Sequence, residues 1–306
     1  MNDPEKATVG CLLLNKNPGM SSFESLRPVK KALDTGKVCH TGTLDSFARG
    51  LLVLLAGRAV KLSPWFSGCD KQYRALLRFG EETDTLDPEG AVIASGPLPR
   101  REDLEAALPA FTGTILQAPP LYSAIHINGK RAHELARAGI ETEMKKRPVT
   151  IHSLSLLSWE PLAGNSVASA ELEIHCSSGT YIRSLARDMA LAIGSRAHLR
   201  SLVRTQVGNF SLNEALSLTE ETANEQEAVK AALLPIDQEL FAKLGIPSVS
   251  IDEKTERLVS HGGDLQNLPL IDDKEGSLAL FGHGSFAALI EKKNGRWKYG
   301  FVNAVD

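Results

Sequence analysis

Two stretches of this 306-residue chain alternate between apolar and polar side chains with a period of two. Residues 72–79 place four apolar side chains on one face: Tyr73, Ala75, Leu77 and Phe79. Residues 171–176 place three on one face: Leu172, Ile174 and Cys176. Successive side chains of a β-strand point to opposite faces, so the pattern predicts two half-buried strands. Each strand should have one face in a core and the other in solvent.

Helices are predicted by their end signals. Ser21 and Glu24 have the spacing of a capping box, and an apolar stretch follows them. Pro28 disfavours a helix interior, so we expect this helix to start near Leu26. Residues 181–193 also have a helical pattern, which ends at a glycine.

The character of the sequence changes after Pro235. Residues 246–306 are rich in glycine and short apolar pairs, and the segments FAALIEKK and WKYGFV flank Asn294-Gly295, which is typical of a β-hairpin. We therefore expect an α+β fold with two domains. Residues 1–238 should form a mixed, mostly antiparallel sheet with flanking helices, and residues 239–306 a small β-rich domain.

Composition excludes several classes of protein. The chain is 42% hydrophobic and 23% charged, which argues against a disordered, collagenous or coiled-coil chain. The longest apolar run, 51–57, is far shorter than the ~20 residues of a membrane span, and the N-terminus lacks a signal-peptide pattern. The four cysteines form no CxxC motif, which disfavours a disulfide scaffold or zinc ribbon. We expect a cytoplasmic protein that does not associate with membranes.

Charge is segregated along the chain although the net charge is only −3. Residues 16–80 carry 11 Lys/Arg against 4 Asp/Glu, and residues 181–204 carry 5 against 1. Residues 81–110 carry 2 against 8. A chain of this kind can present one cationic face that attracts phosphates. Solvated surface charge explains the pattern equally well, so charge alone leaves nucleic-acid binding open.

The segment CHTGTLDSFARG, residues 39–50, has the strongest chemical character. Gly42 between two threonines should allow a tight turn, and Leu44 should anchor the loop in a core. Asp45 would then lie at the tip, in a basic neighbourhood that keeps a carboxylate ionised for action as nucleophile or base. An isolated loop aspartate is more often a turn or capping residue.

One known motif with TGTL can be rejected. In aspartyl-phosphate enzymes, the reactive aspartate lies two residues before TGTL and a lysine follows it. Cys39 and His40 occupy those positions here.

Five segments, in this order, resemble the bacterial tRNA pseudouridine synthases of the TruB family, which isomerise uridine 55 in the T loop of tRNA. The segments are LLLNKNPGMSS (12–22), HTGTLDSFARGLL (40–52), DKQYRALLRFG with ETDTLDPEG (70–90), PPLYSAIHINGKRAHELARAG (119–139) and HCSSGTYIRSLARD (175–188). The resemblance implies a pseudouridine-synthase-like sheet and a PUA-like C-terminal domain.

The resemblance also implies roles for individual residues. Asp45 would be the catalytic nucleophile, Tyr73 would stack on the target uracil, and Arg183 would pair with the catalytic carboxylate. Four further residues would bind substrate or support the pocket: Lys16, His40, Tyr181 and Leu202.

Pseudouridine formation breaks the C1′–N1 bond and rejoins the base through C5, without net redox change or hydrolysis. No cofactor and no metal site are therefore expected, and the sequence has no Rossmann fingerprint or P-loop. The target base must leave its stack, because its reacting atoms are inaccessible in a folded loop. The implied partner is the T arm and T loop of tRNA, gripped by residues of about 120–150. A monomer that needs no guide RNA or protein partner is expected.

The chain departs from the family pattern at two places in the catalytic loop. Cys39 replaces the usual glycine before the loop histidine, and Ser46 replaces the usual proline after the catalytic aspartate. Neither change removes a group that the reaction needs. Two alternatives are a non-catalytic RNA-binding protein on the same scaffold and a synthase working within a guide-RNA particle. Whether Asp45 attacks C6 of the base or C1′ of the ribose is left open by the sequence.

Overall fold

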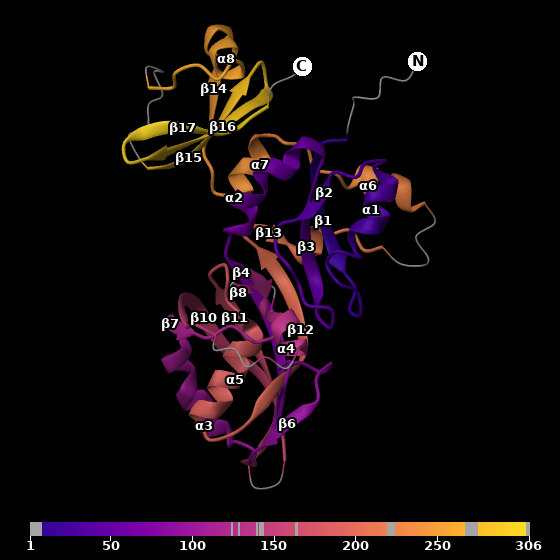
Figure 1. Cartoon of the computed structure of the whole chain (residues 1–306), viewed down its shortest axis with the longest axis vertical. Coiled ribbons are helices and arrows are strands. Elements are labelled where there is room, and N and C mark those ends of the chain that lie inside the picture. Colours follow the sequence, from indigo (N-terminus) through magenta and orange to yellow (C-terminus); the bar gives the residue numbers. More distant parts are fainter. Residues whose placement is uncertain are drawn as a thin grey trace.

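The computed structural model of the chain describes residues 8–303 apart from 124, 128, 139, 141–143, 163–164, 219–223 and 267–274. Its main feature is a mixed sheet (Figure 1). In spatial order its strands are β1 (Gly10–Lys16), β3 (Arg49–Ala56), β12 (Ala197–Val207), β4 (Lys71–Phe79), β11 (Val167–Cys176), β10 (Arg147–Pro161) and β7 (Gly113–Gln117). Two short strands extend it: β2 (Val38–His40) pairs with β3, and β13 (Phe210–Ser211) pairs with β12.

The main sheet is mostly antiparallel. Only the short β3–β12 contact is parallel among its described pairs. The two alternating segments of the sequence are the neighbouring strands β4 and β11, with Tyr73 opposite Ile174. Odd-numbered residues of β4 are buried and its even-numbered residues are at least partly exposed, which confirms the predicted half-buried strand.

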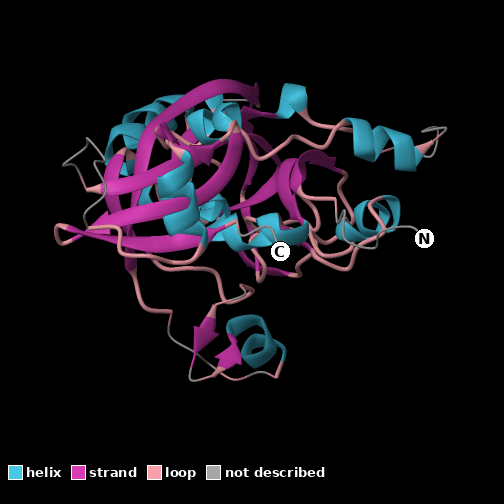
Figure 2. Ribbon diagram, turned by 90° about the horizontal axis from the view of Figure 1, so that it is seen from above, coloured by secondary structure: helices cyan, strands magenta, loops and turns pink. Residues whose placement is uncertain are grey.

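Helices cover the sheet, as the view from above shows (Figure 2). The helix α5 (Ile182–Ala192) packs Leu185 and Met189 into one core with Ala75 and Ile174 of the sheet. The other helical elements of this sheet region are α1 (Leu26–Ala32), η1 (Gly57–Leu62), α2 (Ser63–Ser67), α3 (Arg101–Ala107), η2 (Leu108–Phe111), η4 (Leu212–Glu214) and α6 (Glu225–Ala231). In the described part of the chain, no helix combines the length and the apolar character needed to cross a bilayer.

Both helix predictions are confirmed, since α5 covers most of the predicted segment 181–193. Helix α1 begins at Leu26, beside reciprocal hydrogen bonds between Ser21 and Glu24. Helix α6 begins at Glu225, capped by Asn224. Val149 of β10 is buried where this strand pairs with β7.

Two small hairpins lie between the main strands. One consists of β5 (Glu81–Thr83) and β6 (Val92–Ser95), and the other of β8 (His126–Ile127) and β9 (Lys130–Arg131), which α4 (Ala132–Arg137) follows. The first hairpin brings the acidic turn 84–90 toward the N-terminus of α5, as the contacts below show.

The C-terminal region forms a second sheet, in the order β14 (Ser248–Ile251), β15 (Gly276–Gly282), β16 (Ser285–Lys293) and β17 (Arg296–Val302), with helix α8 (Glu253–Ser260) against it. Asn294 and Gly295 both have positive φ, 54° and 72°, as a type I′ hairpin turn requires. The predicted hairpin and the predicted β-rich C-terminal domain are therefore confirmed. A domain boundary between residues 238 and 239 stays a prediction.

The two sheets share a core, which lies around helix α7 (Gln238–Lys243) (Figure 1). Phe241 of α7 is 0% exposed and lies 4.8 Å from Phe286 and 6.0 Å from Phe281, measured between ring centroids. The same cluster contains Cys11 of β1 and Phe66 of α2. The C-terminal sheet is therefore attached to the main sheet by buried apolar contacts.

Replacing Phe241 with alanine should destabilise both regions. Truncating a buried phenylalanine costs about 3–5 kcal/mol, and here the cavity would open beside both sheets. Thermal unfolding followed by circular dichroism checks this, with Phe23→Ala as control because Phe23 is 66% exposed. A wild-type melting temperature for Phe241→Ala would contradict the shared core.

Candidate active site

A cleft of about 700 Å³ opens where the 41–46 loop, strands β4 and β12, the 84–90 turn and the N-terminus of α5 converge. Five of the seven predicted site residues line it: Asp45, Tyr73, Tyr181, Arg183 and Leu202. Basic residues from both cationic segments of the sequence also line it, as do two acids from the acidic segment: Lys71, Arg204, Asp87 and Glu89.

The centre of the cleft is an ion pair between Asp45 and Arg183. The Arg183 Nη2 donates a hydrogen bond to Asp45 Oδ1 at 3.0 Å. Its Nε lies 2.9 Å from Oδ2, a close charge contact whose N–H is not directed at the oxygen. The Arg183 side chain is only 6% exposed, whereas that of Asp45 is 35% exposed. The anion is thus accessible from the cleft while its cation is buried.

Arg183 has further partners that fix its position. Its Nη1 donates to the Thr85 carbonyl at 2.8 Å and to Asp87 Oδ2 at 3.3 Å, and Nη2 also donates to the Tyr122 carbonyl at 3.0 Å. Burial raises the pKa of Asp87, while hydrogen bonds from Thr85 and the charge of Arg183 oppose that rise. Asp87 was not predicted as a site residue. Its position in the ETDTLDPEG segment was the only available signal.

Helix α5 begins at this site, and a side chain of β7 holds the backbone of its N-cap residue, Tyr181. The buried Gln117 side chain accepts from the Tyr181 backbone N–H at 2.8 Å and donates to the Tyr181 carbonyl at 3.1 Å. A cation near a helix N-terminus is opposed by the helix dipole, whereas anions there are favoured. The carboxylates of Asp45 and Asp87 therefore offset the unfavourable placement of Arg183.

Lys16 supports the loop that carries Asp45 and does not line the cleft. Its Nζ donates to the carbonyls of Ala48, Asn17 and Ser46 at 2.7, 2.9 and 3.2 Å. The residue is 1% exposed, and this burial lowers the pKa of Lys16 to about 8. The predicted supporting position of Lys16 thus has a physical basis: one ammonium holds three backbone carbonyls around Asp45.

Two serines complete the support of the loop. The Ser22 hydroxyl bonds to both the carbonyl and the N–H of Leu44, each at 2.8 Å. The Ser46 hydroxyl donates to the two carboxylate oxygens of Glu89, at 2.8 and 2.7 Å. The second contact ties the residue after Asp45 to the 84–90 turn, at the position where the family resemblance leads us to expect proline.

Tyr73 lies on the floor of the cleft, where strand β4 pairs with β12. It is 7% exposed, and burial raises the pKa of Tyr73, opposed by the charge of Arg204 and a hydrogen bond with it. Arg204 is 2% exposed and donates to the carbonyls of Leu51, Gly42 and Thr43 at 2.7, 3.1 and 3.2 Å. Arg204 was not predicted as a site residue. The available signal was its position on β12, two residues after the predicted Leu202.

The glycine requirement of the loop differs from the prediction. Gly42 does not have a positive φ, and a Cβ there would have only ordinary contacts, the nearest at 3.7 Å. Gly50 has φ +111°, and a Cβ there would lie 2.4 Å from the Arg204 carbonyl. Glycine is thus needed at residue 50, where β3 approaches β12, rather than at the expected tight turn.

The remaining predicted residues differ in position. Leu202 is 4% exposed in the cleft wall, and the Tyr181 ring lies at the rim, 5.2 Å from the Arg147 guanidinium. His40 lies on β2 and does not line the cleft, and burial lowers its pKa. Its Nδ1 is buried without a hydrogen-bond partner among the described residues.

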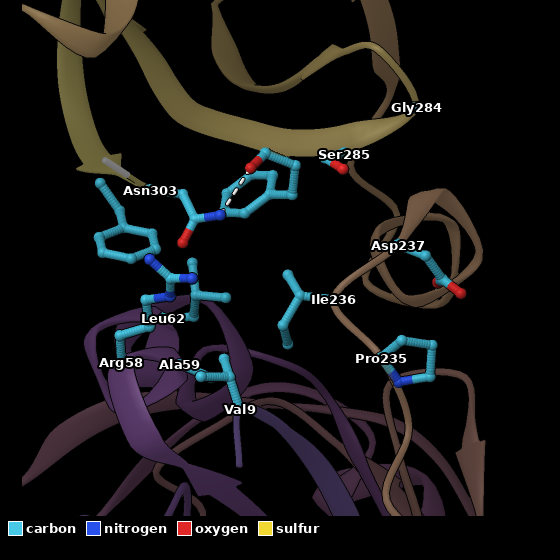
Figure 3. Close-up of a pocket in the computed structure, with 12 residues that line it drawn as sticks. Val9, Arg58, Ala59, Leu62, Pro235, Ile236, Asp237, Gly284, Ser285 and Asn303 are labelled. Carbon is cyan, nitrogen blue, oxygen red and sulfur yellow. Dashed lines mark hydrogen bonds between the residues drawn. The ribbon is translucent and has the colours of Figure 1, made fainter. Parts of the chain in front are cut away.

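A second, smaller cavity of about 320 Å³ lies between η1, the segment before α7 and the C-terminal sheet (Figure 3). Its wall includes apolar side chains of the shared core, such as Leu62 and Phe286. Asp237 there caps helix α7 through the Leu240 N–H, and Asn303 donates to the Phe286 carbonyl. These polar groups stabilise the junction of the sheets, so the larger cleft is the candidate active site.

Comparisons with known proteins show the family to which the chain is similar. Residues 30–182 match the family described as "TruB family pseudouridylate synthase (N terminal domain)", and residues 183–240 match "tRNA pseudouridylate synthase B C-terminal domain". The chain is 41% identical over 298 residues to a tRNA pseudouridine synthase B of Thiobacillus denitrificans, covering 97% of this chain and 96% of that one. It is 44% identical over 245 residues to that of Borreliella burgdorferi (strain ZS7), covering 79% and 83%.

Solved structures share the fold. The chain aligns with a chain of a Cbf5-Nop10-Gar1 complex at a TM-score of 0.68 and 24% identity, covering 96% of this chain and 85% of that one. A chain of the archaeal box H/ACA sRNP Nop10-Cbf5 complex gives 0.67 at 21% identity, covering 99% and 88%.

The fold and the family matches together define an RNA-modifying isomerase, a pseudouridine synthase. The chain belongs to the TruB family. The family resemblance, the fold class and the class of enzyme predicted from the sequence are thereby confirmed, while the roles of individual site residues stay predictions.

Replacing Ser46 with alanine should lower the rate of pseudouridine formation by roughly two- to tenfold, because one hydrogen bond that positions the loop is lost. Ser46→Pro should retain the wild-type rate, since proline restricts the backbone directly. Single-turnover rates check this. The control is Ser169→Ala. It removes a comparable hydrogen bond between a serine and a glutamate, Glu160, near the start of β11. A wild-type rate for Ser46→Ala would show that the Glu89 contact does not position the loop.

The pKa of about 8 at Lys16 predicts opposite effects of alkaline pH on rate and stability. Above pH 8 the ammonium loses a proton and one of its three donors, so turnover should fall. Folding stability should change the other way. Between about pH 8 and 10.5 the unfolded chain holds a proton that the folded chain lacks, so this residue's contribution to stability rises with pH.

The measurement is the difference between wild type and Lys16→Met, which cancels the titration of other groups. Relative to that variant, wild type should gain stability from pH 8 to 10 in chemical denaturation. A difference that stays constant over this range would mean that Lys16 titrates normally.

Proposed function

We propose that this protein isomerises uridine 55 in the T loop of tRNA to pseudouridine, with Asp45 as nucleophile on a flipped-out uridine. The observation that carries the proposal is the Asp45–Arg183 pair, an accessible carboxylate held against a buried guanidinium. The tRNA substrate is proposed from the relatives that are named tRNA pseudouridine synthase B.

The reaction needs a nucleophile, and Asp45 supports that role by its position. It has two oxygens near one cation and a side chain 35% exposed to the cleft. An ionised carboxylate can attack either C1′ of the ribose or C6 of the uracil, and either attack leads to rupture of the C1′–N1 bond. The freed base turns, C1′ bonds to C5, the bond to Asp45 breaks, and the hydrogen of C5 is released as a proton. Arg183 would orient the carboxylate before the attack and after its release.

Tyr73 supports the other requirement, which is a place for the base outside its stack. Its ring lies on the cleft floor beside Leu202, and Arg204 fixes its hydroxyl. Extruding a base costs a few kcal/mol, and stacking on an aromatic ring returns roughly 1–3 kcal/mol. Tyr181 at the rim and His40 beside β3 are proposed to contact the RNA around the extruded base, with Lys16 supporting the loop.

The rest of the tRNA is proposed to contact two other regions. Residues of about 120–150, which include the β8–β9 hairpin and α4, would grip the T arm. The β-rich region 239–306 would act as a PUA-like RNA-binding domain. The names Nop10 and Gar1 belong to the complexes of the structural neighbours, and we propose that this chain acts as a monomer without guide RNA or protein partner.

Asp45→Asn should abolish turnover while tRNA binding stays near wild type, because the amide keeps the shape and removes the nucleophilic anion. The expected loss is roughly 10⁴-fold or more. The measurement is single-turnover release of tritium from C5-labelled uridine with enzyme in excess. Arg183→Lys should lose roughly 10²-fold, since a point charge cannot replace a planar fork.

The matched control is Asp103→Asn, which breaks an exposed pair with Arg100 by the same chemical change. It should turn over at the wild-type rate. Turnover by Asp45→Asn within tenfold of wild type would remove Asp45 from the mechanism. Mapping the product by sequencing tests the position, and modification at a uridine other than 55 would overturn that part of the proposal.

A further inference from the structure

We infer that Asp70, His152 and His175 form a binding site for a divalent transition-metal ion of the zinc type, on the outer face of the main sheet. Among the described residues this is the only group of three potential metal ligands whose donor atoms all lie within 4.8 Å of one another. The site lies outside the active-site cleft, and its proposal does not depend on the proposed reaction.

The geometry of three neighbouring strands assembles the group. Asp70 immediately precedes β4, His175 is the penultimate residue of β11, and His152 lies on β10. Ile151 pairs with Cys176, whereas Ser153 pairs with His175, so His152 is an extra residue at a β-bulge. A bulge redirects the side chain of the extra residue. Here it accompanies two imidazole rings with centroids 4.7 Å apart.

The donor set suits a particular class of metal. Two imidazoles and one carboxylate are ligands that zinc and similar divalent ions accept, with water completing the shell. His152 Nε2 already lies 3.1 Å from Asp70 Oδ2, close to the spacing of ~3.4 Å between ligands that tetrahedral bonds of about 2.0–2.1 Å imply. The third donor is a ring nitrogen of the partly buried His175, and all three donor atoms lie within 4.8 Å of one another. The Asp70 side chain is 47% exposed and that of His152 37%, so both can be reached from solvent.

An ordinary surface ion pair explains Asp70 and His152 but leaves His175 unexplained. Two protonated imidazoles this close to each other would repel, whereas two neutral imidazoles can both be ligands of one metal ion. The neighbouring cation Lys71 is turned away, with Nζ donating to the carbonyls of Ser67 and Cys69. The face that would receive a metal therefore has a carboxylate and two imidazoles without that ammonium.

A bound ion would cross-link the ends of β4, β11 and β10. These ends adjoin the cleft, because β4 continues to Tyr73 and β11 leads through the 177–181 turn to Arg183. The metal would thus stabilise the strands beneath the active site without contacting substrate. Its effect should appear in folding stability, as for any ligand that binds the folded state.

The test uses untagged full-length protein and Zn²⁺ alone, followed by isothermal titration and thermal unfolding. We expect one equivalent to bind with a dissociation constant below about 100 µM and to raise the melting temperature. His152→Gln and His175→Gln should each weaken binding at least tenfold and remove the temperature shift. Co²⁺ titration should give visible absorption of a nitrogen- and oxygen-ligated ion without thiolate charge-transfer bands, which distinguishes this site from binding by Cys39 or Cys69.

The matched control is His283→Gln, which removes the histidine of another exposed pair, with Glu256, for which the described residues supply no third ligand. It should bind Zn²⁺ as wild type does. Circular dichroism without metal shows whether each variant is folded. The proposal is overturned if wild type does not bind Zn²⁺ in this range, if thiolate bands dominate the Co²⁺ spectrum, or if folded His152→Gln and His175→Gln bind as tightly as wild type.

Discussion

The active site depends on one buried guanidinium. Arg183 contacts Asp45 and Asp87 and donates to two backbone carbonyls, so four groups from three separate segments meet at one side chain. A buried cation is stable only if its hydrogen-bonding capacity is met. Neighbouring hydrogen bonds hold Arg183 and its partners in place. Gln117 binds the backbone of Tyr181 at the start of α5, and the Thr85 hydroxyl and the Glu89 N–H donate to the Asp87 carboxylate. The Asp45 carboxylate is therefore exposed to the cleft, whereas Arg183 is buried and held by several hydrogen bonds.

The loop that carries Asp45 is held mainly through its backbone. Lys16 and Arg204 both donate to loop carbonyls, and Ser22 bonds to both backbone groups of Leu44. Contacts to carbonyls hold a cation near the loop without adding a second anion to compete for Arg183. Together with the Ser46–Glu89 contact, these carbonyl contacts hold the loop that carries Asp45.

Local patterns predicted local structure well. The alternation of β4, the Asn-Gly hairpin and the helix ending at Gly194 each depend on the period or end signal of a single segment. The family motifs placed five of seven site residues in one cleft. What could not be predicted depends on pairing between distant segments. The glycine needed at residue 50 is explained only by its approach to Arg204, and the absence of His40 from the cleft follows from its pairing on β2.

Contacts between distant segments also give neighbouring polar residues of the 84–90 turn different partners. Asp87 and Glu89 lie in one short turn, yet one holds Arg183 and the other holds Ser46. The turn therefore links Arg183 to the loop that carries Asp45, so a displacement of the turn would change both at once. Proline after the aspartate would restrict the loop by itself, whereas serine makes its position depend on the turn. In this chain, the placement of the carboxylate and that of its cation are thus mechanically coupled through three residues of the 84–90 segment: Thr85, Asp87 and Glu89.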